Sequence, residues 1–104
     1  MKKYTVHITP NASAMLIQIY EYIAFELLGP IYAGEQLINL QNQISSLDTM
    51  PKRCKVISKT IYPGYELRRM LVDNYSVFFY IDNNIVNVTD ILYSRSDILE
   101  RLKK

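Results

Sequence analysis

Two adjacent arginines open the stretch YELRRMLVDNYSVFFYID, residues 65 to 82, at the end of the most basic part of the chain. Residues 52 to 69 hold six basic residues against one acid, a net charge of +5, whereas the rest of the chain carries −3. Such a region attracts phosphate or an acidic partner, although a solvated loop of surface lysines remains the alternative. The basic residues are Lys52, Arg53, Lys55, Lys59, Arg68 and Arg69.

The arginine pair divides between the two faces of a predicted sheet. If Asp73-Asn74 is a two-residue turn, residues paired across it share a face and alternate residues point oppositely. We expect Arg68 at the rim of a helix face, with its head near Glu35, Asp48 or water. Arg69 lies on the opposite, outer face, which is the candidate working face. The helix face carries Met70, Val72, Tyr75, Val77, Phe79 and Ile81, and the outer face carries Leu67, Arg69, Leu71, Ser76, Phe78 and Tyr80.

The remaining reactive residue types are few. His7 is a candidate general base, but a lone histidine on a strand is more simply a rim residue. Neighbouring cations favour a lowered pKa for the Cys54 thiol, yet no histidine or aspartate is paired with it. One cysteine and one histidine leave no metal-ligand spacing, so we predict neither a metal nor a cofactor.

A strand and two helices precede the basic segment. Residues 4 to 8 alternate between apolar and polar side chains, as in a half-buried strand. Thr9 can cap a first helix that has Pro10 at its first position and ends at Gly29-Pro30. A second helix is predicted over residues 31 to 47. Its apolar seam is too short for a stable coiled coil, which favours packing against the first helix and a sheet over dimerisation.

Three strands are predicted after the basic segment, at residues 66 to 72, 75 to 81 and 85 to 93, with short polar turns between them. The order β-α-α-β-β-β indicates an α+β fold: an N-terminal strand, a helical hairpin and an antiparallel three-strand meander, with the helices packed on one face. With 104 residues, 49% of them hydrophobic, we expect a single domain over residues 1 to 104. The single cysteine and the absence of an apolar leader favour a cytoplasmic protein without membrane insertion.

These parts together resemble the RelE/ParE family of bacterial type II toxins. The likeness is carried by the element order, by the proline after the second helix, by ELRRMLVDNYSVFFYID and by ILYSRSD, which closes the last strand. The resemblance implies a toxin silenced by a cognate antitoxin that is acidic or amphipathic. RelE-like members cut mRNA in the ribosome, whereas ParE-like members block DNA gyrase without being nucleases. The first hypothesis is ribosome-dependent mRNA cleavage; gyrase inhibition is the alternative, and an inactive autoregulatory module is a third.

Under the RNA-cleavage hypothesis, arginine suits stabilisation of the phosphorane because its fork binds phosphate oxygens. Arg69 and Arg95 are therefore the predicted phosphate clamps. Tyr80 and Tyr93 are predicted to stack a base or hold a phosphate. Ser76 departs from the nuclease pattern, which has arginine directly after the tyrosine, and no tyrosine follows Arg95. The predicted nucleic-acid contacts are Lys52, Arg53, Lys55 and Lys59.

Overall fold

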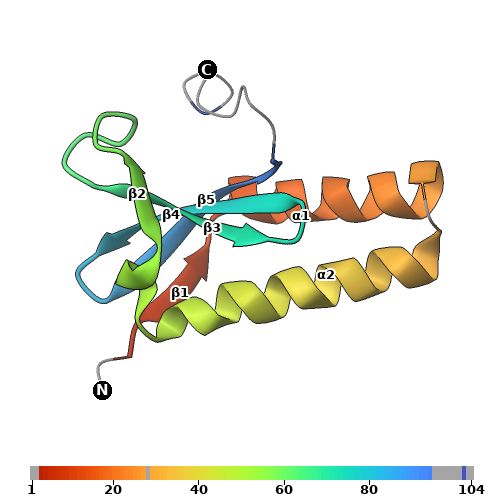
Figure 1. Ribbon diagram of the computed structural model, residues 1–104, viewed down its shortest axis with the longest axis horizontal. Helices are drawn as coiled ribbons and strands as arrows, with labels where there is room; N and C mark the ends of the chain where they lie inside the picture. The colour runs from red at the N-terminus through yellow and green to blue at the C-terminus, as the bar shows by residue number, and fades with distance from the viewer. Residues whose placement is uncertain (1–2, 28, 95–101, 103–104) are drawn as a thin grey trace.

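The computed structural model describes residues 3–27, 29–94 and 102, and it has an α+β fold (Figure 1). The predicted fold class is confirmed, with one additional strand. The elements are β1 (Thr5–Ile8), α1 (Pro10–Tyr22), the π-helical turn η1 (Ile23–Leu27), α2 (Pro30–Ser45), the 3-10 turns η2 (Ser46–Asp48) and η3 (Pro51–Arg53), β2 (Lys55–Ser58), β3 (Leu67–Val72), β4 (Tyr75–Asp82) and β5 (Ile85–Tyr93).

The five strands form one sheet in the order β1-β5-β4-β3-β2. Strands β3, β4 and β5 make the predicted antiparallel meander, and β1 joins β5 in parallel. The predicted register of the β3–β4 hairpin is confirmed, because Arg68 pairs with Phe79 and Val72 with Tyr75. In the turn, Asp73 adopts a φ of +53°, a conformation that Asp tolerates better than most residues.

Thr9 positions the helical hairpin on the sheet. Its hydroxyl accepts a hydrogen bond from the Ala12 amide (3.2 Å), as predicted for a helix cap, and donates one to the Val88 carbonyl of β5 (2.8 Å). Helix α1 passes into η1, and Gly29 then takes a φ of +96° before Pro30 begins α2. Only glycine adopts that angle without strain, which fixes the corner of the hairpin here.

Strand β2 lies inside the basic segment, where the sequence indicated no strand. It is only four residues long, and Lys55 and Ser58 have weak strand preference. Pairing with β3 forms it instead: Lys55 pairs with Arg69 and Val56 with Arg68. The meander therefore has an extra edge strand that carries cations.

A β-bulge lies where β4 pairs with β5. Phe78 pairs with Asp90 and Phe79 with Val88, so Thr89 is the extra residue of β5. The alternation of β5 shifts at this point. Val88 and Ile91 share the helix-face core, whereas Leu92 belongs to the cluster on the outer face.

The two faces of the sheet are covered unequally. The helices cover one face. Five of the six residues predicted for the helix face are buried in the core there, and the sixth, Ile81, is partly buried and packs against it. The outer face holds a smaller cluster formed by Leu67, Phe78 and Leu92. This cluster is packed against Met15, Ile57, Ile61, Tyr62 and Leu102. The middle of the predicted working face is therefore closed by apolar side chains.

Candidate functional site

Arg69 lies on the outer face, as predicted, in a row of residues that runs across four strands. Lys55 of β2 pairs with it on one side and Phe78 of β4 on the other. Lys55 is exposed, so the two cations form a small basic site at the sheet edge. An arginine fork beside an ammonium can bind a phosphate or a carboxylate.

Ser76 holds the Arg69 side chain. The Arg69 Nε donates to Ser76 Oγ at 2.9 Å, and Ser76 Oγ is also 2.8 Å from Ser94 Oγ. Ser76 is fully buried. The position where a RelE-like nuclease has a cation thus serves here to orient an arginine.

Tyr80 stands in an aromatic cluster on the outer face. Its ring centroid is 5.2 Å from that of Tyr62 and 4.6 Å from that of Tyr65. Burial raises the pKa of Tyr62, against the opposing effect of a hydrogen bond with Thr89. The carboxylate of Asp82 raises the pKa of Tyr65. Both phenols are therefore protonated at neutral pH, and the cluster offers aromatic contact area rather than a base.

Tyr93 is not brought together with Arg69. Tyr93 pairs with Tyr75, a residue of the helix-face core, and their ring centroids are 5.7 Å apart in an edge-on arrangement. Tyr93 therefore lies on the other side of the sheet from Arg69. Arg95 lies outside the described residues.

The predicted nucleic-acid contacts are dispersed. Arg53 binds the chain itself: its Nη1 donates to the carbonyls of Thr49 (2.6 Å) and Met50 (3.0 Å) and its Nη2 to Ser46 Oγ (3.1 Å). Lys59 lies 3.9 Å from a Glu66 carboxylate oxygen, and both side chains are exposed. Only Lys55 of this group adjoins Arg69.

Arg68 has a structural position, but the predicted acidic partners were wrong. Its Nη1 donates to the carbonyls of Cys54 (2.7 Å) and Lys52 (3.1 Å), and its Nη2 lies 3.2 Å from Glu66. The side chain is only 13% exposed. Arg68 therefore fastens the η3–β2 segment to β3.

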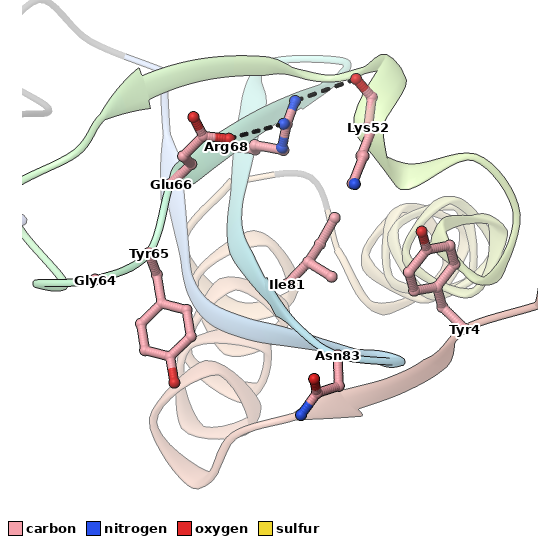
Figure 2. A pocket seen from close by; sticks show the side chains of 8 residues that line it. All are labelled: Tyr4, Lys52, Gly64, Tyr65, Glu66, Arg68, Ile81 and Asn83. Carbon is pink, nitrogen blue, oxygen red and sulfur yellow. Dashed lines mark hydrogen bonds and ion pairs between the residues drawn. The ribbon is translucent and has the colours of Figure 1, made fainter.

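A pocket of about 460 Å³ adjoins Arg68 at the edge of the sheet. Figure 2 shows Lys52 and Tyr4 on one side and Tyr65 on the other, with Ile81 between them. Among the described residues, no carboxylate pairs with the Lys52 ammonium. An apolar group next to a carboxylate would fit these walls. No sequence pattern predicts this pocket, because its residues come from separate segments. Gly64, Glu66 and Asn83 complete the lining.

Cys54 and His7 contribute no evident chemistry. Burial raises the pKa of the Cys54 thiol and outweighs the opposing charges of Arg53 and Arg68, which corrects the expectation of a lowered pKa. His7 is exposed on β1 and pairs with Asn87. Within the described residues, no three His, Cys, Asp or Glu side chains are grouped as metal ligands, and no helix is long and apolar enough to cross a membrane.

Comparison with known proteins agrees with this arrangement. A chromosomal ParDE toxin-antitoxin structure from P. aeruginosa superposes with a TM-score of 0.72 at 18% identity, covering 91% of this chain and 100% of the other. The RelBE2 toxin-antitoxin complex from Mycobacterium tuberculosis gives a TM-score of 0.56 at 19% identity, with 88% and 99% covered. No curated protein sequence matches significantly. The family model of the ParE toxin of the type II toxin-antitoxin system parDE matches residues 6–98, and the chain therefore belongs to this family.

Proposed function

We propose that this ParE-family toxin inhibits DNA gyrase by binding it, without cleaving RNA. The observation that carries the proposal is the closed outer face, where Arg69 is held by Ser76 beside the buried Phe78. The match to the ParE model supports the same choice, because ParE-like members of this superfamily are the gyrase inhibitors.

The chemistry of RNA cleavage explains why a closed outer face favours binding. Attack by a 2′-hydroxyl needs one group to take its proton and another to protonate the leaving oxygen. Arg69 cannot supply either group, because arginine stays protonated in proteins. Lys55 is exposed, and its hydrated ammonium is available to bind a phosphate oxygen. The described neighbours of Arg69 thus provide phosphate binding but no acid-base pair.

RNA cleavage is the second candidate, and it is supported by the Lys55–Arg69 pair. These two cations lie on the same face as the stacked Tyr62, Tyr65 and Tyr80, which resembles a phosphate site beside a platform for bases. Under this candidate, Arg69 stabilises the phosphorane, and Arg95, Tyr93, Lys52, Arg53 and Lys59 stay candidate contacts in the ribosome.

Two assays on one preparation separate the candidates. For gyrase inhibition, we expect the purified toxin to block supercoiling of relaxed plasmid by gyrase, and primer extension after induction to show no new mRNA ends. Normal supercoiling at a large excess of toxin, together with new ends in cellular transcripts, would overturn the proposal in favour of RNA cleavage.

The substitution Arg69→Ala sharpens this test. If the toxin cleaves RNA through Arg69, the Arg69→Ala variant should stay folded but no longer arrest growth. The reason is that loss of a positioned charge costs about a hundredfold or more in rate. Gyrase inhibition predicts that growth arrest persists. The matched control is Lys3→Ala, which removes an exposed cation whose partner is Asp48 and which belongs to neither set of predicted contacts.

We further propose a cognate antitoxin as partner, as in the toxin-antitoxin complexes of similar fold. The Lys52 pocket suits an acidic, amphipathic segment, since it combines the apolar Ile81 with an ammonium that has no carboxylate partner among the described residues. Copurification of tagged toxin with the product of an adjacent reading frame tests this partner. A toxin that purifies alone from such coexpression would exclude it.

A further inference from the structure

The free end of the helical hairpin exposes large apolar side chains. Figure 1 shows that the end of α1, η1 and the start of α2 extend beyond the sheet. Phe25 is 74% exposed and Ile31 is 83% exposed, and Tyr22 and Tyr32 are more than half exposed. We call these four residues the hairpin tip. Grouped exposure of this kind on a small protein marks an interaction surface.

The charged residues near the tip in sequence are acidic. From residue 10 to residue 48 the chain contains four acids and no lysine, arginine or histidine. Glu21, Glu26 and Glu35 are exposed and lie next to the tip in sequence. The rest of the chain has 12 basic residues against six acids, so residues 10 to 48 carry −4 and the remainder +6. The overall charge of +2 therefore conceals a strong separation of charge.

This separation limits what the tip can bind. An acidic surface repels nucleic acid, and it also repels the acidic antitoxin that the family resemblance implies. It attracts a protein surface in which lysines or arginines surround apolar side chains. A projecting helix pair suits a groove, because α2 alone, with 16 residues, is about 24 Å long.

We propose that the hairpin tip is the surface by which the toxin binds its target, inserting into a basic, apolar-lined groove of DNA gyrase. The assignment rests on the proposed gyrase inhibition, and it names the contact surface for it. A DNA-processing enzyme must carry basic surfaces to hold phosphates, and such a surface complements the glutamates around the tip. The basic end of the molecule, with its Lys52 pocket, remains for the antitoxin.

Two tip variants test the proposal, each with a matched control. The apolar variant is Phe25→Ser with Ile31→Ser, and its control is Leu71→Ser, which removes an equally exposed aliphatic group from the sheet (65% exposed). The charge variant is Glu21→Gln, Glu26→Gln and Glu35→Gln. Its control adds the same +3 at the sheet end of α2, by Gln41→Lys, Asn42→Lys and Gln43→Lys. All substituted side chains are exposed, so folding should be retained.

The measurements are affinity for gyrase holoenzyme, supercoiling inhibition and affinity for the antitoxin. We expect the apolar variant to weaken gyrase binding at least tenfold, and the charge variant to weaken it several-fold at low salt and less at high salt. Both controls should bind gyrase like wild type, and both tip variants should keep antitoxin affinity. If the tip variants inhibit gyrase as strongly as the wild type does, the hairpin tip is not the contact surface. The proposed gyrase inhibition itself would still stand.

Three further results would also overturn it. Loss of antitoxin binding in the tip variants would assign the surface to the antitoxin. A change confined to the oligomeric state of the free toxin would assign it to a second copy, whose basic sheet is the complementary surface. Failure of wild-type toxin to bind gyrase at all would remove the proposed function, and this assignment with it.

Discussion

Arg68 and Arg69 are adjacent in the chain but have different roles because alternate residues of a strand point to opposite faces. Arg68 binds two backbone carbonyls and Glu66 on the helix side, whereas Arg69 binds one serine and keeps its fork beside Lys55. The division by face could be predicted from the turn and the alternation. The carbonyl partners of Arg68 could not be predicted in this way. They belong to the η3–β2 segment, whose position is determined only by packing in the folded chain.

The difference between the two arginines is measurable as stability. We expect Arg68→Met to lower the free energy of unfolding by about 2 to 3 kcal/mol, because it leaves two carbonyls and a carboxylate without their donor. Arg69→Met should cost about 1 kcal/mol, since it removes one hydrogen bond to a serine that retains Ser94. Urea unfolding followed by circular dichroism measures both. Equal losses would contradict the structural role of Arg68.

At the scale of elements, Asp73 connects the β3–β4 turn to helix α2. One carboxylate oxygen, Oδ2, accepts hydrogen bonds from Asn39 Nδ2 (2.7 Å) and Gln36 Nε2 (3.1 Å). This contact joins the polar face of α2 to the β3–β4 turn of the sheet. The sequence shows that this face of α2 is rich in amide side chains. It does not show that Asp73 is their partner. The orientation of the hairpin tip depends on this contact.

We expect Asp73→Ala to lower the free energy of unfolding by about 1 kcal/mol, because the two hydrogen bonds are exposed and compete with water. A double-mutant cycle with Asn39→Ala isolates the contact from the effect of the turn itself. The two losses should be less than additive. Strict additivity would show that Asp73 acts only through its left-handed backbone conformation.

Strand β2 and the bulge at Thr89 are two features of secondary structure that local sequence patterns do not predict. Both depend on a neighbouring strand: β2 exists because β3 pairs with it, and the bulge exists because Phe78 and Phe79 pair with Asp90 and Val88. Hydrophobic alternation predicts the faces of β3 and β4 correctly. In β5 it cannot indicate the residue at which the alternation shifts.

For the whole molecule, buried thiol and phenol groups lower the stability at alkaline pH. Burial raises the pKa of Cys54, Tyr62 and Tyr75, so the folded protein holds these protons more tightly than the unfolded chain does. The contribution of these groups to the free energy of unfolding is fully present at neutral pH. As pH rises past about 8.5 to 10, the unfolded chain loses these protons first and the free energy of unfolding falls.

Urea unfolding between pH 7.5 and 10.5 measures this dependence. We expect a constant midpoint near neutrality and a steady decrease at the alkaline end. The variant Cys54→Ala should remove the part of the decrease that begins earliest and keep the part due to the tyrosines. A midpoint that rises with pH would contradict the assigned direction of the pKa shifts.

The position of β5 between β1 and β4 has a consequence for biosynthesis. Strand β1 and helix α1 are synthesised before their sheet partners Val88, Thr89 and Asp90. Strand β1 and helix α1 therefore cannot take their places beside β5 until β5 itself has been synthesised. The sheet is complete only once β5 has been inserted between β1 and β4, and an antitoxin that recognises the complete sheet can capture the toxin only after that step.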